Sequence, residues 1–202
     1  MNSAEQKKSV RREFSSRRKS LNPEYKSKAD AAINRRICEL LEGLSSNLIA
    51  AYISDGFEAD LSAAIEYCLA FGKKVFLPRY TPKSGIYEMA EISNLTADLV
   101  PGKYGLAEPA ELLPAASAAE LKSMVWLVPG VAFDLSGMRL GRGGGYYDRL
   151  LQNAEGTVIG VFYDCQRAVE LPAVDHDRRL NMVVTESSVF NFEETVTEEN
   201  SK

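Results

Sequence analysis

The stretch from Met124 to Leu150 reads M-V-W-L-V-P-G-V-A-F-D-L-S-G-M-R-L-G-R-G-G-G-Y-Y-D-R-L. Its apolar start, Met124–Val128, predicts a short buried strand, and its end predicts a helix over Gly145–Ala154. Between them, four of the five residues from Gly141 to Gly145 are glycine. Because open α/β sheets bind ligands at the carboxyl ends of their strands, this strand–loop–helix unit predicts both a fold class and a place for a ligand.

Strand and helix segments alternate on both sides of this unit, which predicts a single α/β domain over residues 1–192. Further strands are expected at Leu48–Ile53, Val75–Leu77 (closed by Pro78), Ile86–Ile92, Thr157–Tyr163 and Met182–Thr185. A helix is expected from Asp60 to Gly72, and residues 97–118, rich in Pro, Gly and Ala, are expected to form a long connection. The alternation implies three layers, helix–sheet–helix, around a mostly parallel sheet, and the acidic residues 193–202 are expected to fray.

Two more helices are expected at the N-terminus, separated at Asn22-Pro23-Glu24. Asparagine caps a helix, proline suits its first turn and glutamate complements its dipole, so these three residues indicate a stop and a restart. Lys7, Arg11 and Arg18 share one face of the first helix, beside its apolar stripe. This basic face would lie where the helix meets the body and could close over phosphates; the alternative is a solvated helix face.

Composition excludes several classes of protein. The chain has 202 residues, 45% apolar and 26% charged, which is typical of a globular domain. Its longest apolar runs are far below the ~20 residues that span a bilayer, and no secretory signal is visible in the first twenty residues. Three cysteines lack a metal-binding spacing, and Cys68 is predicted to be a buried free thiol. We therefore expect a reduced, soluble, cytoplasmic protein.

The net charge of −4 is unevenly distributed along the chain. Residues 1–36 hold eleven Lys or Arg and four acidic residues, a balance of +7, so the remainder carries −11. A basic arm on an acidic body argues against general coating of nucleic acid but allows a local anion site.

The glycine loop has the chemistry of a phosphate site. Glycines expose backbone N–H groups without Cβ obstruction, and Arg139 and Arg142 add bidentate donors for phosphate oxygens. Asp148, one turn into the following helix, is placed to hold a hard cation such as magnesium. The loop is neither a Walker sequence nor G-x-G-x-x-G, because Tyr146 stands where the last glycine should be. The alternative is a tight turn without a ligand.

Two other residues deserve a function hypothesis and an alternative. Glu58 follows the first strand of the expected sheet, where a carboxylate could face a ligand or simply begin a helix. His176 is the only histidine. It has neither a zinc-type cluster nor a Ser or Cys nucleophile nearby, so we interpret it as a surface residue.

The segment F-D-L-S-G-M-R-L-G-R-G-G-G-Y-Y-D, Phe133–Asp148, resembles the signature of the 5-formyltetrahydrofolate cyclo-ligase (5,10-methenyltetrahydrofolate synthetase) family. Four weaker motifs follow the family's order: K-x-x-V-R at Lys7–Arg11 with Arg17-Arg18, Y-I-S-D-G-F-E at Tyr52–Glu58, Y-G-L-A-E-P at Tyr104–Pro109, and L-P…D…V-V-T-E from Leu171 to Glu186. The resemblance covers nearly the whole chain.

The resemblance implies an enzyme that uses ATP and magnesium to cyclise 5-formyltetrahydrofolate to 5,10-methenyltetrahydrofolate, with release of ADP and phosphate. The formyl oxygen would attack the γ-phosphate, the nearby aryl nitrogen would close onto the activated carbon, and phosphate would leave. Such chemistry asks for positioning and phosphate neutralisation and needs no protein nucleophile.

The resemblance also implies roles for individual residues. The expected ATP contacts are Lys7, Arg11, Arg139, Leu140, Gly141, Arg142, Gly143, Gly144, Gly145, Tyr146 and Tyr147. Ile53 and Glu58 fall where the family holds the folate, and Arg142 and Tyr146, between the two substrates, are the expected catalytic residues. Asp148 matches a magnesium ligand. Asn181 stands where the family often has a second aspartate; its amide oxygen could bind magnesium, but without the charge.

Two rival functions remain open. A sugar-phosphate isomerase or CoA transferase could share the layered sheet, but this rests on fold analogy and leaves the arginine-flanked glycine loop unexplained. A nucleic-acid-binding protein could use the basic arm, but it would need aromatic side chains near that arm for base stacking, and Phe14 and Tyr25 fall on apolar stripes. We expect a monomer whose partners are small molecules, with no nucleic acid and no membrane.

Overall fold

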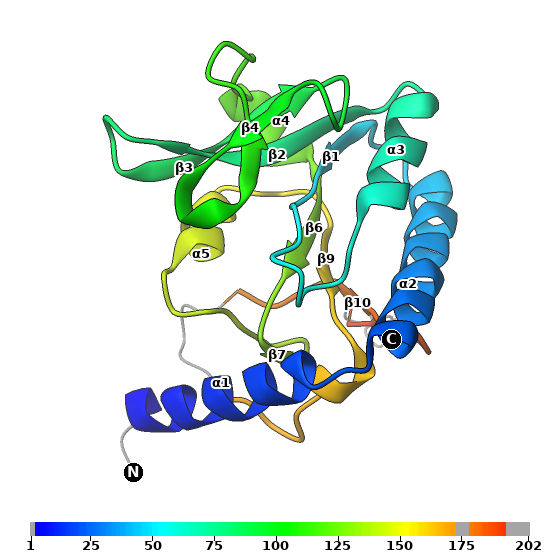
Figure 1. Cartoon of the computed structure of the whole chain (residues 1–202), viewed down its shortest axis with the longest axis vertical. Coiled ribbons are helices and arrows are strands. Elements are labelled where there is room, and N and C mark those ends of the chain that lie inside the picture. The colour runs from blue at the N-terminus through cyan, green and yellow to red at the C-terminus, as the bar shows by residue number, and fades with distance from the viewer. Residues whose placement is uncertain (1–2, 173–177, 193–202) are drawn as a thin grey trace, which may run out of the picture.

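The computed structural model describes residues 3–172 and 178–192 and has a seven-stranded sheet at its centre (Figure 1). In spatial order the strands are β11 (Val189–Asn191), β10 (Met182–Val184), β9 (Val158–Val161), β6 (Val125–Pro129), β1 (Leu48–Ala50), β2 (Lys74–Thr81) and β3 (Ile86–Ile92). The five inner strands run parallel, and the two edge strands, β3 and β11, are antiparallel to their neighbours. The prediction of an α/β fold with a mostly parallel sheet is confirmed.

Helices cover both faces of the sheet. On one face α2 (Pro23–Gly43) and α3 (Ser62–Ala70) pack on side chains such as Leu127, and on the other α4 (Ala118–Ser123) and α5 (Tyr146–Leu150) flank Trp126 (Figure 1). Successive residues of β6 point to opposite faces, and both faces are buried, so the strand is apolar throughout. The three-layer arrangement follows from this burial.

Helix α1 (Ser3–Lys19) covers neither face and lies across one end of the sheet (Figure 1). Phe14 is buried there in a small cluster with residues of the β7 (Ala132–Phe133) and β8 (Arg139–Leu140) hairpin. The predicted helix boundary is confirmed, since Asn22 Oδ1 accepts from the backbone N–H groups of Glu24 at 2.8 Å and Tyr25 at 3.4 Å. This end of the sheet carries the carboxyl ends of the parallel strands.

Two predictions about strands are wrong. Pro78 does not close β2, which continues to Thr81. The carbonyl of Phe76 points toward β1 and accepts from the N–H of Ala51. The backbone of Pro78, two residues later, points to the same side but lies past the end of β1, so no hydrogen bond is lost through the missing N–H of proline. Residues 97–118 are not a bare connection, because they contain a small sheet of β4 (Leu99–Pro101) and β5 (Ala107–Pro109) around the 3-10 turn Lys103–Gly105.

Several predicted elements are shorter in the structure. Strand β1 ends at Ala50, and α5 ends at Leu150, with Leu151 as its C-cap residue. Asp60 does accept from Ser62 N and Oγ at the start of α3, as expected. In the described part of the chain no helix is long and apolar enough to cross a membrane.

Cys68 is buried and free, as predicted, and burial raises the pKa of its thiol to about 11. The thiol therefore stays protonated near neutral pH and behaves as a small apolar side chain. His176 and residues 193–202 lie outside the described residues.

Candidate active site

A cavity of about 500 Å³ opens at the carboxyl ends of β1 and β6. It lies between helix α1, the glycine loop, the loop after β1 and the strands β2 and β3. The lining residues are Lys7, Arg11, Tyr52, Ile53, Glu58, Pro78, Tyr87, Leu106, Pro129, Gly130, Arg139, Leu140, Gly141, Arg142, Gly143, Gly144, Gly145, Tyr146, Tyr147, Asp148 and Leu150. Its volume suits a small organic ligand.

Basic groups and backbone amides form one wall of the cavity. Arg11 Nε donates to the carbonyl of Gly141 at 2.9 Å, which ties α1 to the glycine loop. Gly143 has a φ of +97°, and a Cβ there would also lie 3.4 Å from the Arg11 guanidinium, so only glycine suits the position. Arg11 on the basic face thus lies where α1 meets the glycine loop, and closure of this face over phosphates stays a prediction.

Arg139 and Asp148 form an ion pair at the edge of this wall. Arg139 Nη2 lies 2.6 Å from Asp148 Oδ1, and its Nη1 donates to the carbonyl of Pro129 at 3.2 Å. The Asp148 side chain is 69% exposed, so it can exchange this partner for a cation. Because α5 has only five residues, its dipole adds less to the anion site than the predicted longer helix would.

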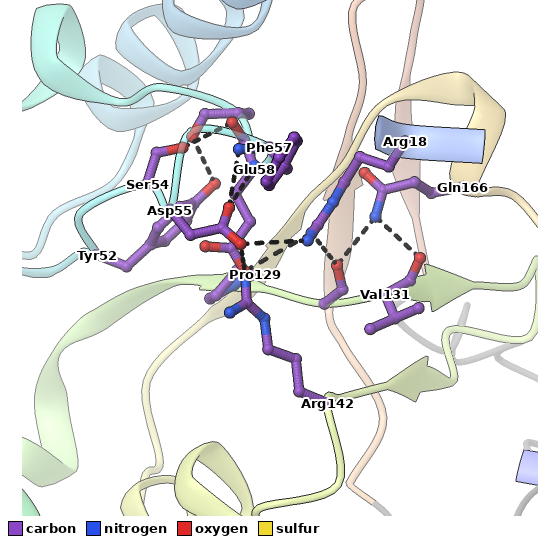
Figure 2. A network of polar contacts seen from close by, with 12 residues as sticks. Arg18, Tyr52, Ser54, Asp55, Phe57, Glu58, Pro129, Val131, Arg142 and Gln166 are labelled. Carbon is purple, nitrogen blue, oxygen red and sulfur yellow. Dashed lines mark hydrogen bonds and ion pairs between the residues drawn. The ribbon is translucent and has the colours of Figure 1, made fainter. Parts of the chain in front are cut away.

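Two carboxylates and two arginines meet beside the cavity (Figure 2). Arg142 Nη2 contacts Asp55 Oδ2 and lies 2.8 Å from Glu58 Oε1. Arg18 approaches the same groups from α1, with its Nη2 3.6 Å from Asp55 Oδ2 and its Nη1 3.7 Å from Glu58 Oε1. Glu58 is therefore a buried, ion-paired carboxylate and does not begin the helix; α3 starts at Ser62, whose N–H and hydroxyl donate to Asp60.

The loop after β1 is shaped by its own polar side chains. Asp55 Oδ1 accepts from the N–H groups of Phe57 and Glu58, each at 2.9 Å, and Ser54 Oγ donates to the carbonyl of Glu58 at 2.8 Å. Tyr52, buried beneath, donates its hydroxyl to the carbonyl of Ala59 at 3.0 Å. These bonds turn the loop so that the Glu58 carboxylate faces the cavity.

The pKa values of Glu58 and Asp55 are shifted in opposite directions. Burial raises the pKa of Glu58 above its usual value, although Arg142 and Arg18 oppose the shift. Burial also acts on Asp55, but the backbone N–H groups of Glu58 and Phe57 and the two arginines outweigh it and lower the pKa. The ionised form of Glu58 thus depends on its arginine partners.

Aromatic side chains form the outer part of the cavity. The rings of Tyr87 and Tyr146 meet edge to face with centroids 4.9 Å apart, and Tyr80 lies 5.4 Å from Tyr87. A Cβ at Gly144 would lie 2.6 Å from the Tyr146 ring, so glycine there lets the ring fold back over the loop. Burial, together with the nearby Glu58, raises the pKa of Tyr147, so this phenol stays protonated.

The structure gathers all but one of the residues predicted for the site around this cavity. The exception is Asn181. Its Oδ1 accepts from the N–H of Val158 at 2.8 Å, at the amino end of β9, whereas the cavity opens where Val161 pairs with Pro129. The expectation that Asn181 ligates magnesium does not fit this placement, because the amide is already used to begin β9 at the other end of the strand.

The sequence did not predict that Asp55 belongs to the site, and it did not predict the contacts of Arg18. Asp55 stands in the motif Y-I-S-D-G-F-E, but nothing in the spacing indicates that it contacts Arg142, 87 residues away. Arg18 was placed on the basic face of α1, yet its side chain is only 4% exposed and points to carboxylates, not toward the phosphate side. No group of three or more His, Cys, Asp or Glu side chains suited to a metal occurs within residues 3–172 and 178–192.

The fold and the cavity together define an α/β protein in which a glycine loop with two arginines faces a buried carboxylate. The chain belongs to the 5-formyltetrahydrofolate cyclo-ligase family, whose model matches residues 3–186, and it is therefore an enzyme of the ligase class.

Individual relatives agree with this assignment. The 5-formyltetrahydrofolate cyclo-ligase of Escherichia coli strain K12 is 32% identical over 180 residues, which cover 87% of this chain and 98% of the relative. That of Mycolicibacterium smegmatis is 37% identical over 147 residues, 70% and 75% of the two chains. The NMR structure of 5,10-methenyltetrahydrofolate synthetase from Aquifex aeolicus superimposes with a TM-score of 0.83 at 29% identity, covering 96% of each chain.

Proposed function

We propose that this enzyme converts 5-formyltetrahydrofolate and ATP to 5,10-methenyltetrahydrofolate, ADP and phosphate, with magnesium as cofactor. The observation that carries the proposal is the single cavity in which Lys7, Arg11 and the glycine loop face Glu58. One side suits a polyphosphate and the other suits a ring with N–H donors, so two substrates could meet there.

The proposed reaction needs two displacements. The formyl oxygen attacks the γ-phosphorus, and the bond to the bridging oxygen of ADP breaks. The aryl nitrogen then attacks the activated formyl carbon and loses its proton, and the carbon–oxygen bond breaks so that phosphate leaves with the formyl oxygen. Both steps gain chiefly from orientation and from neutralisation of charge on the transferred group.

The chain's own residues supply that neutralisation. In the proposal Lys7, Arg11 and Arg139, with the loop amides, hold the phosphates, and Arg142 and Tyr146 lie between the two substrates. Glu58 accepts hydrogen bonds from the folate ring, with Ile53 beside it. Burial makes this carboxylate selective, since a ligand without N–H donors would displace water from it without supplying hydrogen bonds in return.

Asp148 is the residue proposed to hold magnesium. It lines the cavity, is mostly exposed and pairs with Arg139, whose guanidinium group can also bind phosphate oxygens. Magnesium keeps several waters and shares substrate phosphate oxygens, so one carboxylate suffices if the metal arrives with the nucleotide. When bound, magnesium would offset phosphate charge.

The direct test is one assay of the purified protein. Protein, ATP, magnesium and 5-formyltetrahydrofolate are mixed, and the near-ultraviolet absorbance of the methenyl product is followed, with matched reactions lacking ATP or magnesium. We expect absorbance only in the complete mixture. A well-folded protein that gives no product would overturn the proposed function.

The Glu58→Gln variant is expected to bind the folate less well. The amide keeps the shape but loses the charge that the ring N–H groups would face, so the KM for 5-formyltetrahydrofolate should rise about tenfold, equivalent to ~1.4 kcal/mol. The KM for ATP should change by less than about twofold. Glu66→Gln, an exposed change on α3, is the control. Equal shifts in both KM values would contradict the folate role of Glu58.

Changing Asp148 is expected to alter the response to magnesium. In Asp148→Asn the half-saturating free magnesium at saturating ATP should rise roughly tenfold, because hard cations are held largely by ligand charge. Glu155→Gln is a matched control, since both carboxylates are 69% exposed and 2.6 Å from a basic partner. If the two variants titrate alike, the metal is held elsewhere.

The nucleic-acid alternative finds less support. Lys7 and Arg11 line the cavity and Arg18 is buried, so these three cations do not form an outward-facing basic surface. Binding of a DNA oligonucleotide across a salt series would test this alternative, because phosphate-driven binding weakens steeply as salt rises.

A further inference from the structure

Arg18 and Arg142 contact the same two carboxylates but are held very differently. The Arg18 side chain is 4% exposed and comes from the last turns of α1, whereas the Arg142 side chain is 49% exposed and comes from the glycine loop. The two guanidinium groups approach Asp55 and Glu58 from different elements (Figure 2). The Arg18 side chain is therefore fixed by its surroundings, whereas the Arg142 side chain can move away from the two carboxylates.

Arg18 is fixed by bonds that do not involve the carboxylates. Its Nη1 donates to the carbonyl of Gly130 at 3.2 Å, and Gln166 Nε2 donates to the same carbonyl and to that of Val131, each at 2.9 Å. Phe14, one turn earlier on α1, is buried against the β7–β8 hairpin. The guanidinium is thus anchored at the carboxyl end of β6 whether or not a ligand is present.

Arg142 cannot serve both sides of the cavity at once. In the structure its guanidinium is engaged by Asp55 and Glu58, and with Arg18 the cluster holds two positive and two negative charges. In the proposed reaction Arg142 turns toward phosphate, which removes the closer cation from Glu58. A buried carboxylate that loses its partner takes up a proton unless another cation remains.

We propose that Arg18 is a positioning residue, the fixed counter-ion that keeps Glu58 ionised and aimed at the folate ring while Arg142 engages the nucleotide. The inference rests on the proposed function and adds to it a division of labour between the two arginines. Arg18 is too deeply buried to reach the cavity, which its side chain does not line, so it acts through Glu58 and not on a substrate.

The charged and titratable groups around Glu58 come from five segments of the chain. Asp55 lies on its own loop and disfavours its ionised form, and Arg18 and Arg142 favour it. The phenols of Tyr52 and Tyr147 are close enough for the carboxylate to raise their pKa, and the Tyr163 hydroxyl lies 3.2 Å from the Glu58 carbonyl. Once Arg142 has left, Arg18 is the one cation among these groups, so its removal should raise the pKa of Glu58 further.

The test compares Arg18→Gln with Arg17→Gln, a neighbouring change at an exposed arginine that pairs with Glu13. For Arg18→Gln the KM for 5-formyltetrahydrofolate should rise about tenfold at pH 7.5, and the KM for ATP less than about twofold. The KM for 5-formyltetrahydrofolate should rise as pH falls, because protonated Glu58 is a poor hydrogen-bond acceptor. The pH at which it begins to rise should move upward by about one unit relative to wild type. Arg17→Gln should match wild type in all three readouts.

Two further variants separate positioning from mere stability. In the Glu58→Gln background, Arg18→Gln should add less than about twofold to the folate KM, since residues that act as a unit are not additive. Arg18→Lys, which keeps the charge, should restore the pH profile. If Arg18→Gln does not fold, the Lys variant decides: a wild-type pH profile with a selective folate effect supports the proposal, and equal loss for both substrates overturns it.

Failure of this inference is distinguishable from failure of the proposed function. A wild-type protein that makes no methenyl product contradicts the proposed function itself. A wild-type protein that is active, with an Arg18→Gln variant whose folate KM and pH profile are unchanged or whose effect is fully additive with Glu58→Gln, contradicts only the role of Arg18.

Discussion

Arg142→Ala is expected to lower kcat/KM roughly 30- to 800-fold in the cyclisation assay, which corresponds to a loss of about 2–4 kcal/mol of transition-state stabilisation. In the structure this guanidinium reaches from the glycine loop to Asp55 and Glu58, and in the proposed reaction it turns toward the phosphate between the substrates. Its removal therefore takes away positive charge from the transferred phosphoryl group. The melting temperature should change little, because the side chain is half exposed and Arg18 stays beside the carboxylates.

The matched control for this variant is Arg149→Ala. Arg149 lies about one helical turn after the glycine loop, where its Nη2 donates to the carbonyl of Gly144 at 3.1 Å and its guanidinium lies 5.2 Å from the Tyr146 ring centre. It does not line the main cavity, so kcat/KM should stay within a few-fold of wild type. If Arg142→Ala were equally mild, the loop would not neutralise phosphate through this residue.

Trp126→Ala is expected to have the largest effect on stability. Trp126 is fully buried in the middle of β6, within the cluster that joins the sheet to α5. Removing a fully buried Trp side chain leaves a cavity and costs about 3–5 kcal/mol of the free energy of unfolding. For a chain of this length that corresponds to a fall of roughly 6–20 °C in Tm, measured by calorimetry or circular dichroism.

Phe71→Ala is the control for stability. Phe71 follows α3 and is 70% exposed, so its loss should change the free energy of unfolding by no more than about 0.5 kcal/mol. The pair tests burial and not aromatic character. A Trp126→Ala protein that melts within about 2 °C of wild type would contradict the description of this core.

The strand and helix pattern of the chain could be predicted from short-range signals. Asn22-Pro23-Glu24 separates two helices because capping and proline act within one turn, and residues 86–92 form a strand at the bounds predicted from alternation. The elements missed were short strands that are stabilised by pairing with a neighbouring strand and not by an apolar pattern of their own. Strand β11 pairs with β10, and β4 and β5 pair with each other across a turn, although none has a strong pattern of its own.

Pro78 and Asn181 show why local rules fail at particular positions. Proline normally ends a strand, but Pro78 lies beyond the end of β1, so its missing N–H costs nothing. Asn181 matches a ligand position in order along the chain, yet its amide is used by Val158. In both cases the neighbouring strand decides the outcome, and its length and register are not local properties.

The sequence by itself determined the α/β class, the glycine loop and the basic face of α1, because periodicity, capping and backbone freedom depend on residues a few positions apart. Only the tertiary structure decided which charges meet. Asp55 and Glu58 contact Arg142 across 87 and 84 residues of chain, and they contact Arg18 across 37 and 40 residues. An electrostatic interaction depends on distance and burial in the folded protein, and these arise only once the sheet brings the ends of its strands together.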